Sequence, residues 1–264
     1  EELAVPKTFR DYNRVASFFT RGCNAASPPQ YGSTVAIGNV VVSPSEFMPR
    51  LFAENGRLLD SQGRITLDTP EALRALENYR ETYSYSDRTI YDFWKNALEG
   101  FADGTAAMTV VFINYASHIL NSQMSRIAGK LGFAPVPGGK PLLGGGVIGI
   151  TQSCTCPAAA CKFLEWLYAD LVAPVFTMLG GLSPCRSAYS NRDISEQYPW
   201  LSTARKSFPT AQRRSNSTYY QNFSELQLET ILAAHVQQAV LGVCSPEEAL
   251  KQAQEDCNRY FQPW

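Results

Sequence analysis

The stretch FADGTAAMTVVF, residues 101–112, decides the expected fold, because it leads from the end of a helix into a buried strand. The preceding residues, 91–101, have the apolar spacing of a helix, and Gly104 follows where such a helix would end. Residues 106–112 form a short, continuous apolar run, which is typical of a strand covered on both faces. A helix followed by a buried strand indicates an α/β fold.

The same alternation of helices and strands extends over the rest of the chain. Apolar runs predict further strands at residues 35–42, 131–136 and 147–151. Capping residues, prolines and terminal glycines predict helices that begin near residues 8, 45, 69, 113, 157, 224 and 245. The helix that begins at residue 113 is expected to run to 127, and Phe163, Trp166 and Leu167 are expected to be buried together. We therefore expect a helix-rich α/β lobe over residues 5–140 and a more helical part over residues 141–264.

The composition excludes several classes of protein. The chain has 264 residues, 45% of them hydrophobic, which is enough for a substantial core and too apolar for a disordered tail. Its 23 basic residues are balanced by 24 acidic residues, so we expect no nucleic acid as a partner. No apolar run is long enough to span a membrane. The first residues are neither a signal peptide nor a start methionine, so a processed or excised chain is expected.

The seven cysteines leave two interpretations open. An odd number cannot pair completely within one chain, and reduced thiols are favoured over a disulfide framework. The closely spaced Cys154, Cys156 and Cys161 lack the paired CxxC spacing of structural zinc sites, and the chain has only two histidines. We expect no metal site.

The sequence also argues against a cofactor and against catalysis. Gly144, Gly146 and Gly149 match GxGxxG, but they precede a predicted strand instead of linking a strand to a helix, so no dinucleotide cofactor is expected. Glycines at that place favour close backbone approach to a ligand or a hinge. His118 and His235 lie in predicted helices without a nucleophile motif beside them, and a structural role is favoured for both.

Aromatic residues gather where the chain changes direction. Scattered aromatics are usually core residues, yet strand ends and helix starts are also where α/β folds bind small ligands. Aromatic faces beside polar groups suit the CH and OH surfaces of sugars. The residues concerned are Phe112, Tyr115, Tyr219, Tyr220 and Phe223. Arg186 lies in a loop, where its guanidinium has two open interpretations, contact with a ligand or pairing with a carboxylate.

Eight segments follow one another in the order found in a known family. The chain resembles the extracellular solute-binding proteins of carbohydrate ABC transporters, family 1, which are maltose-binding-protein-like. The matching segments are VPKTF (5–9), residues 51–56 with 65–75, FADGTAAM (101–108), GFAPVP (132–137), residues 144–150, AAACKFLEWL (158–167), residues 181–186 and GVCSPEEALKQA (242–253).

The resemblance implies an α/β fold of the periplasmic-binding-protein-like type II, with two lobes around a ligand cleft. Residues 5–140 would form the second lobe, and residues 141–264 would form the returning helical part of the first lobe. The N-terminal part of lobe 1 has no counterpart in this sequence, so the first lobe is expected to be incomplete. Closure of the lobes around the ligand would act as the signal.

The resemblance also implies a set of ligand-binding residues. They are Ser43, Ser45, Phe112, Asn114, Tyr115, Gly144, Gly145, Gly146, Arg186, Tyr220 and Glu225. The family commonly places a tryptophan after the strand that ends in Ala-Met, where it stacks on the sugar. This chain has Phe112-Ile113-Asn114-Tyr115 there, so a stacking role falls to Phe112 or Tyr115.

The function implied is non-enzymatic binding of a carbohydrate, by family default an oligosaccharide, as the solute-binding component of an ABC importer. The expected partners are that ligand and the ABC permease subunits, with the chain itself a monomer. The expected location is extracytoplasmic, with a lipoprotein anchor in an N-terminal part that this chain lacks. The alternatives are a ligand-sensing domain of a regulator, cytoplasmic because of its cysteines, and a small-molecule enzyme.

Overall fold

The computed structural model describes residues 3–38, 40–89, 93–190, 194, 196 and 198–264. Two short strands, β1 (Tyr31–Thr34) and β2 (Ala106–Thr109), pair in parallel, with Tyr31 opposite Ala106 and Ser33 opposite Met108. Helix α4 (Trp94–Ala102) leads into β2 through Gly104, whose φ of +78° is a left-handed conformation that suits glycine. The expected succession of helix, glycine and strand at residues 101–112 is therefore confirmed, with the strand ending at Thr109. The prediction that this strand is buried is wrong, because Ala106 is the one buried residue of β2. Residues 91 and 92 lie outside the described residues.

The chain forms two compact units. Unit 1 consists of residues 1–111, 136–143 and 210–264, and unit 2 of residues 112–135 and 144–209. These bounds differ from the expected division at residue 140. The physical reason is that α11 (Glu225–Leu241) packs against α2 (Val42–Ala53) and α3 (Pro70–Ser84), which joins the C-terminal part of the chain to unit 1.

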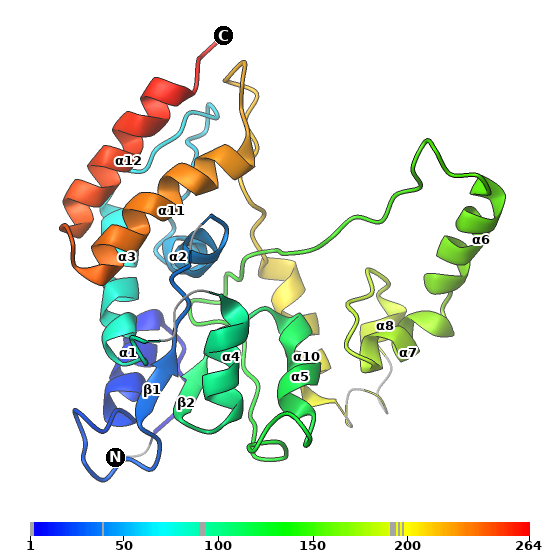
Figure 1. Ribbon diagram of the computed structural model, residues 1–264, viewed down its shortest axis with the longest axis horizontal. Coiled ribbons are helices and arrows are strands. Elements are labelled where there is room, and N and C mark those ends of the chain that lie inside the picture. Colours follow the sequence, from blue (N-terminus) through cyan, green and yellow to red (C-terminus); the bar gives the residue numbers. More distant parts are fainter. Residues whose placement is uncertain (1–2, 39, 90–92, 191–193, 195, 197) are drawn as a thin grey trace. The chain divides into compact units, whose positions relative to one another are not determined.

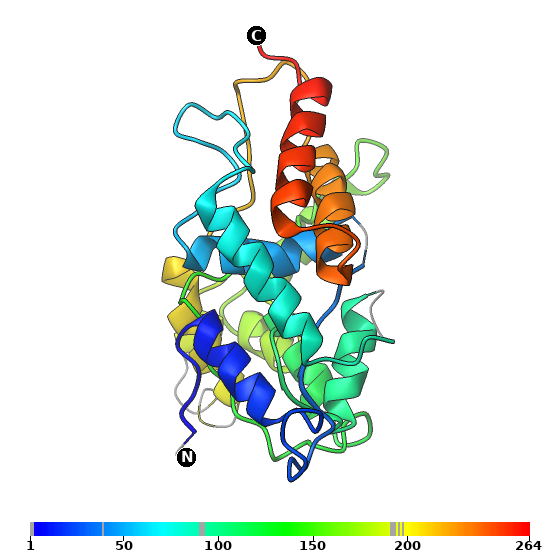
Figure 2. The same ribbon diagram turned by 90° about the vertical axis from the view of Figure 1, so that its left-hand side faces the viewer.

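Unit 1 is built from helices packed around the small sheet. Helix α1 (Phe9–Phe18) contacts α3 and β1, and α12 (Pro246–Tyr260) lies beside α11 in both Figure 1 and Figure 2. The predicted N-caps at Thr8, Thr69 and Ser245 are confirmed, because each side chain accepts a hydrogen bond from a backbone N–H of the first turn. Ser224 caps α11 in the same way.

The core of unit 1 contains a buried ion pair. Arg50 and Glu46 lie on α2, with side chains 2% and 6% exposed, and Nη1 of Arg50 lies 3.1 Å from Oε2 of Glu46. The guanidinium also lies over the rings of Phe9 and Tyr79, at 4.7 and 4.8 Å from their centroids. Burial raises the pKa of Glu46, and the positive charge of Arg50 opposes that rise.

Unit 2 consists of short helices around a separate core. The helices whose bounds are described are η1 (Ile113–Tyr115), α5 (Ala116–Leu120), α6 (Pro157–Leu167), α7 (Val172–Met178), α8 (Ser187–Ser190) and α10 (Pro199–Ser207). The chain then leads through η2 (Phe208–Thr210) back to unit 1. Trp200, which is 1% exposed, and Tyr189, which is 4% exposed, are the largest side chains of this core. Tyr189 also donates a hydrogen bond to the backbone oxygen of Ser183 at 2.8 Å.

The prediction of a strand at residues 35–42 is wrong. Strand β1 ends at Thr34, and Val42 already begins α2. Residues 35–38 and Val42 are buried as predicted, whereas Val40 is exposed. Carbonyl groups of residues 36–38 accept hydrogen bonds from side chains instead of from a neighbouring strand. Tyr79 donates to Ala36 O at 2.5 Å, and Gln237 donates to Ile37 O at 2.8 Å.

Other local expectations in and around unit 2 are also wrong. Residues 131–136 and 147–151 form no strand, and the helix expected to run to residue 127 ends at Leu120. The predicted buried face of α6 consists only of Leu167, because Phe163 and Trp166 are 55% and 56% exposed. A strand needs a neighbouring strand, and in the described chain the one backbone hydrogen bond of residues 147–151 is local, from Cys154 N to Thr151 O at 3.0 Å.

Candidate functional site

Three charged side chains and a serine meet at the start of α11 in unit 1. Nη2 of Arg214 donates to Oγ of Ser45 at 3.0 Å, and Nη1 of the same guanidinium pairs with the carboxylate of Glu229. The positive charge of Arg214 also acts to lower the pKa of Glu225, which lies in the first turn of α11. Glu225 and Glu229 are one helical turn apart, so both carboxylates lie on one face of α11. We call Ser45, Arg214, Glu225 and Glu229 the Arg214 cluster.

Burial controls the electrostatics of the Arg214 cluster. It raises the pKa of Glu229, whose side chain is 3% exposed, and the charge of Arg214 opposes the rise. Burial likewise raises the pKa of Glu225 against the effect of Arg214. Oε1 of Glu225 is buried and has no hydrogen-bond partner among the described residues. A buried acceptor without a partner can receive a hydrogen bond from a ligand hydroxyl or amine.

Ser43 and Tyr220 already have partners within the fold. Ser43 is fully buried, and its hydroxyl donates to Gly38 O at 2.6 Å. The hydroxyl of Tyr220 accepts a hydrogen bond from the backbone N–H of Ile65 at 2.9 Å. The ring of Tyr220 packs on Phe261, with centroids 5.6 Å apart. The structure thus gives both residues a place in the packing of unit 1.

Phe112 and Gly144 lie together in unit 2. A Cβ atom on Gly144 would lie 2.9 Å from the Phe112 ring, so a larger residue at position 144 would displace that ring. The neighbouring Gly145 and Gly146 have nothing within 4 Å of such an atom, and all three glycines are exposed. At Gly144 the backbone thus closely approaches an aromatic ring of the same unit, and the predicted approach to a ligand or a hinge stays a prediction.

The remaining predicted residues are also in unit 2. Asn114 is exposed and Tyr115 is half-buried, both in η1. Arg186 is exposed just before α8, where its backbone oxygen accepts from Tyr189 N at 3.0 Å. Of the eleven predicted residues, the structure brings Ser45 and Glu225 together in the Arg214 cluster and Phe112 and Gly144 together in unit 2.

Residues 1–203 match the protein family described as bacterial extracellular solute-binding protein. That match covers more than half of the sequence. The chain belongs to this family. The family that the short motifs predicted is therefore confirmed.

Individual relatives agree with the family assignment. A probable amino-acid ABC transporter periplasmic-binding protein of Sinorhizobium fredii is 21% identical over 199 residues, which is 74% of this chain and 44% of the relative. The maltose-bound MalE3 of T. maritima is a structural neighbour with a TM-score of 0.81 and 21% identity, over 97% of this chain and 66% of its own. An ABC transporter solute-binding protein of Thermotoga lettingae, bound with α-D-tagatose, has a TM-score of 0.72 and 25% identity, over 96% of this chain and 64% of its own.

These comparisons confirm the expected fold class. The structural neighbours have the periplasmic-binding-protein-like type II fold, and this solute-binding protein matches them over nearly all of its length. It spans less than half of the curated relative and about two thirds of the neighbours. No helix in the described part of the chain is long and apolar enough to cross a membrane.

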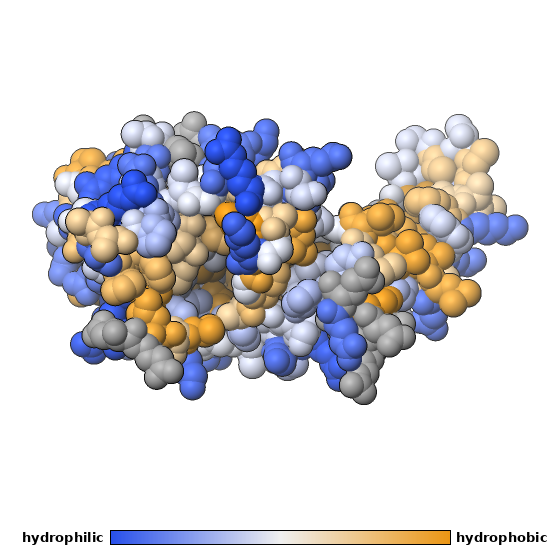
Figure 3. Space-filling model, turned by 90° about the horizontal axis from the view of Figure 1, so that it is seen from below, coloured by the Kyte–Doolittle hydropathy of each residue, from blue (hydrophilic) through white to orange (hydrophobic). Residues whose placement is uncertain are grey.

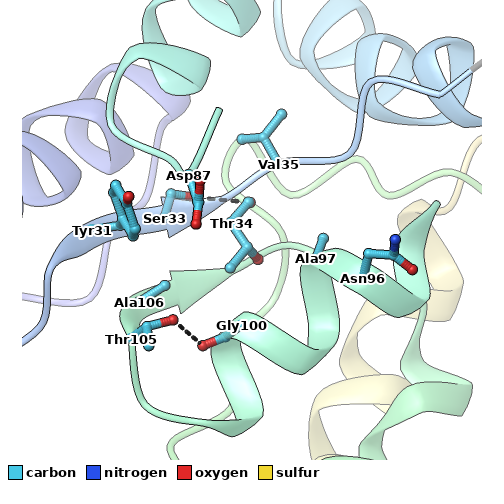
Figure 4. Close-up of a pocket in the computed structure, with 10 residues that line it drawn as sticks. All are labelled: Tyr31, Ser33, Thr34, Val35, Asp87, Asn96, Ala97, Gly100, Thr105 and Ala106. Carbon is cyan, nitrogen blue, oxygen red and sulfur yellow. Dashed lines mark hydrogen bonds between the residues drawn. The ribbon is translucent and has the colours of Figure 1, made fainter. Parts of the chain in front are cut away.

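One small cavity lies in unit 1 of this solute-binding protein and is too small for a sugar. Figure 4 shows Thr34, Asp87 and Asn96 among the residues around it, beside β1 and α4. Its volume of about 10 Å³ is at the lower limit for one water molecule. Among the described residues, no group of three or more His, Cys, Asp or Glu side chains is arranged to hold a metal ion.

Sequence reasoning missed Arg214 and Glu229. Arg214 follows Arg213 in a loop, and nothing local links it to Ser45, which is 169 residues away. The spacing of Glu229 could have indicated it, because Glu229 stands four residues after Glu225 in a correctly predicted helix and therefore lies on the same helix face.

Proposed function

We propose that this chain is part of the solute-binding component of an ABC importer and that its ligand is a carbohydrate or polyol. The observation that supports a carbohydrate or polyol as the ligand is the Arg214 cluster. Its guanidinium is already paired with Glu229, and Oε1 of Glu225 is left as a buried acceptor. Such an acceptor suits a neutral molecule with many hydroxyl donors.

The solved neighbours support a polyhydroxylated ligand. Their bound molecules are ribitol, maltose, D-mannitol and α-D-tagatose. Each has several adjacent hydroxyl groups, which a carboxylate binds well by charge-assisted hydrogen bonds. The transporter names of the relatives also favour an importer component over the sensor domain of a regulator.

An amino acid is the second candidate ligand, favoured by the name of the Sinorhizobium relative. An amino acid would need a cation for its carboxylate and an anion for its ammonium group. In the Arg214 cluster, Glu225 offers the anion, while Arg214 is committed to Glu229 and Ser45. This arrangement favours the polyol over the amino acid.

Isothermal titration of the purified full-length protein tests the proposal, with maltose, D-mannitol, ribitol and a mixture of amino acids as titrants. We expect binding of at least one sugar or polyol. Glu225→Gln should weaken that binding about tenfold, because an amide accepts hydroxyl hydrogen bonds less strongly than a carboxylate. Glu247→Gln is the matched control, since Glu247 is exposed in the first turn of α12. Binding of amino acids alone would overturn the proposed ligand class.

We also propose that the protein acts outside the cytoplasmic membrane as a monomer, anchored through a segment outside these residues, and delivers its ligand to ABC permease subunits. The family description supports the extracellular location. Reconstitution with the permease tests the partnership, because ligand-dependent ATP hydrolysis should require this protein. Light scattering that shows a stable dimer would contradict the monomer.

A further inference from the structure

Exposed apolar side chains are distributed differently in the two units. Of the 25 large hydrophobic side chains that are exposed in the described chain, eleven lie within residues 144–182 of unit 2, on the right of Figure 3. Those of unit 1 are scattered along its sequence, and a single exposed apolar side chain needs no explanation. The surroundings of each side chain therefore decide whether it has a binding role. In unit 1, the surroundings of Phe93 point to a ligand.

Phe93 lies at the end of the sheet where α/β folds bind small ligands. It directly precedes α4, which runs back to the start of β2, so its ring lies towards the carboxyl end of that strand. Asn96, in the first turn of α4, lines the same small cavity as Val35, the residue that follows β1 (Figure 4). The start of α4 therefore lies beside the carboxyl ends of both parallel strands, outside which such folds bind their ligands.

Trp94 holds the ring of Phe93 in place. The two ring centroids are 5.0 Å apart, with the rings edge-on at 60°. Trp94 itself packs, together with Val41, on the buried side chains of Ala36, Val42 and Ala97. Phe93 remains 46% exposed. A ring that is already fixed loses little conformational freedom when a ligand binds to it.

The turn before α2 has a strained backbone. Val40 has a φ of +56°, which is rare for a β-branched residue, and it is 37% exposed. The loop before it is fixed, because side chains of α2, α3 and α11 bond to the carbonyl groups of residues 36–38. Strained backbone persists where its surroundings determine it, and such places cluster at ligand sites. Val40 and Phe93 each precede a residue that packs on the same buried cluster, which places two exposed apolar side chains at one end of the sheet.

A polar group without a partner stands beside the ring. The backbone N–H of Asn96 donates to Phe93 O at 3.1 Å, so both side chains leave the same turn. The Asn96 side chain is half-buried, and among the described residues its amide has no hydrogen-bond partner (Figure 4). An amide both donates and accepts hydrogen bonds, which suits a hydroxyl group. An aromatic ring and a free amide together match the C–H and O–H groups of a sugar.

The Phe93 ring and the Arg214 cluster lie along the same helix. The buried group under Trp94 includes Val42, in the first turn of α2. Ser45 stands three residues later on the same face and accepts the hydrogen bond from Arg214. An aromatic surface and the buried acceptor of the cluster are therefore placed along one side of α2, which fits a ligand with C–H faces and several hydroxyl groups.

We propose that a sugar or polyol stacks on the ring of Phe93 and that the Asn96 amide bonds to one of its hydroxyl groups. This contact rests on the proposed ligand class and adds two contact residues to it in unit 1. It differs from the sequence-based prediction, which gave the stacking role to Phe112 or Tyr115, both of them in unit 2. Ligand affinity should therefore depend on an aromatic ring at position 93.

Isothermal titration of the purified full-length protein tests the contact, with maltose, ribitol, D-mannitol and α-D-tagatose as titrants. Phe93→Leu keeps an apolar side chain against Trp94 but removes the flat ring, so it should weaken binding at least about fivefold. Phe93→Tyr keeps the ring and should bind at least about threefold more tightly than Phe93→Leu. Asn96→Ala should weaken binding about fivefold, because one hydrogen bond to the ligand is lost.

Phe18→Leu is the matched control. Phe18 is 38% exposed and its ring lies edge-on to that of Phe19, with centroids 5.2 Å apart, so its packing resembles that of Phe93. It lies at the other end of the sheet, because the nearby Thr20 hydroxyl accepts from the backbone N–H of Gly32 near the start of β1. Phe18→Leu should leave the affinity within about twofold of wild type.

Two results would overturn the stacking on Phe93 while the proposed function holds. One is an unchanged affinity of Phe93→Leu for the ligand that wild type binds. The other is equal weakening by Phe93→Leu and Phe93→Tyr, which would mean that position 93 only packs against Trp94. An unchanged affinity of Asn96→Ala would overturn the hydrogen bond. If wild type binds none of the four titrants, the proposed ligand class and the stacking fail together.

Discussion

Arg214 donates a hydrogen bond to the hydroxyl of Ser45 at 3.0 Å, although 169 residues separate them in the sequence. The contact joins the loop before α11 to the first half of α2. The same guanidinium neutralises Glu229, so one side chain connects two helices and balances a buried carboxylate. Ser45 is predicted to bind ligand, and in the structure its hydroxyl accepts a hydrogen bond from the cation of the cluster.

Arg214→Met should lower the free energy of unfolding by about 2 kcal/mol, because the buried carboxylate of Glu229 loses its counter-charge. Urea denaturation measures the change. Arg74→Met is the control, since Arg74 is 50% exposed in its pair with Glu54, and its loss should change the free energy of unfolding much less because solvent screens that pair. Equal losses in the two variants would mean that the Arg214 pair is no more important to stability than a surface pair.

The buried Glu46 should make stability depend on pH. Its pKa is raised in the folded protein above the ordinary value of 4.5, so the folded state holds the proton more tightly than the unfolded state. As pH falls from 7 towards 4.5, wild type should therefore gain stability relative to Glu46→Gln, which cannot titrate.

Urea denaturation of wild type and Glu46→Gln at several pH values measures that difference. Glu99→Gln serves as the control, because Glu99 is an exposed partner of Lys95 on α4. A difference between wild type and Glu46→Gln that stays constant or shrinks as pH falls would contradict a raised pKa for Glu46.

Gly32 is needed for the approach of β1 to α1. A Cβ atom at position 32 would lie 1.8 Å from the backbone oxygen of Ala16, and backbone cannot move aside easily. Gly32→Ala should cost about 3 kcal/mol of stability. At Gly22, an added Cβ meets nothing within 4 Å, so Gly22→Ala should leave the thermal midpoint nearly unchanged. A tolerated Gly32→Ala would mean that the packing of α1 on β1 is looser than described.

The thiols should differ strongly in reactivity. Burial raises the pKa of Cys257 to about 12, and its side chain is fully buried, so it should resist alkylation at pH 8 until the protein unfolds. Cys23, Cys156 and Cys161 are exposed and should react first. Peptide mapping after a short treatment with iodoacetamide measures the rates. Labelling of Cys257 as fast as Cys23 would show that α12 opens readily.

The sequence by itself determined the local elements that carry their own signals. The caps at Thr8, Thr69 and Ser245 predict their helices correctly, because a capping hydrogen bond spans only three residues. The turn through Gly104 into β2 is local for the same reason. The ordered short motifs also indicated the family, which the match over residues 1–203 confirms.

Tertiary structure decided which apolar runs are strands and which polar residues meet. Residues 35–38 look like a strand, but side chains of Tyr79 and Gln237 satisfy two of the carbonyl groups. Residues 147–151 have strand composition, but no strand pairs with them in the described part of the chain. Arg214 lies beside Ser45 because α11 packs on α2. Strand pairing and contacts between charges far apart in sequence depend on where distant segments lie, which local patterns do not encode.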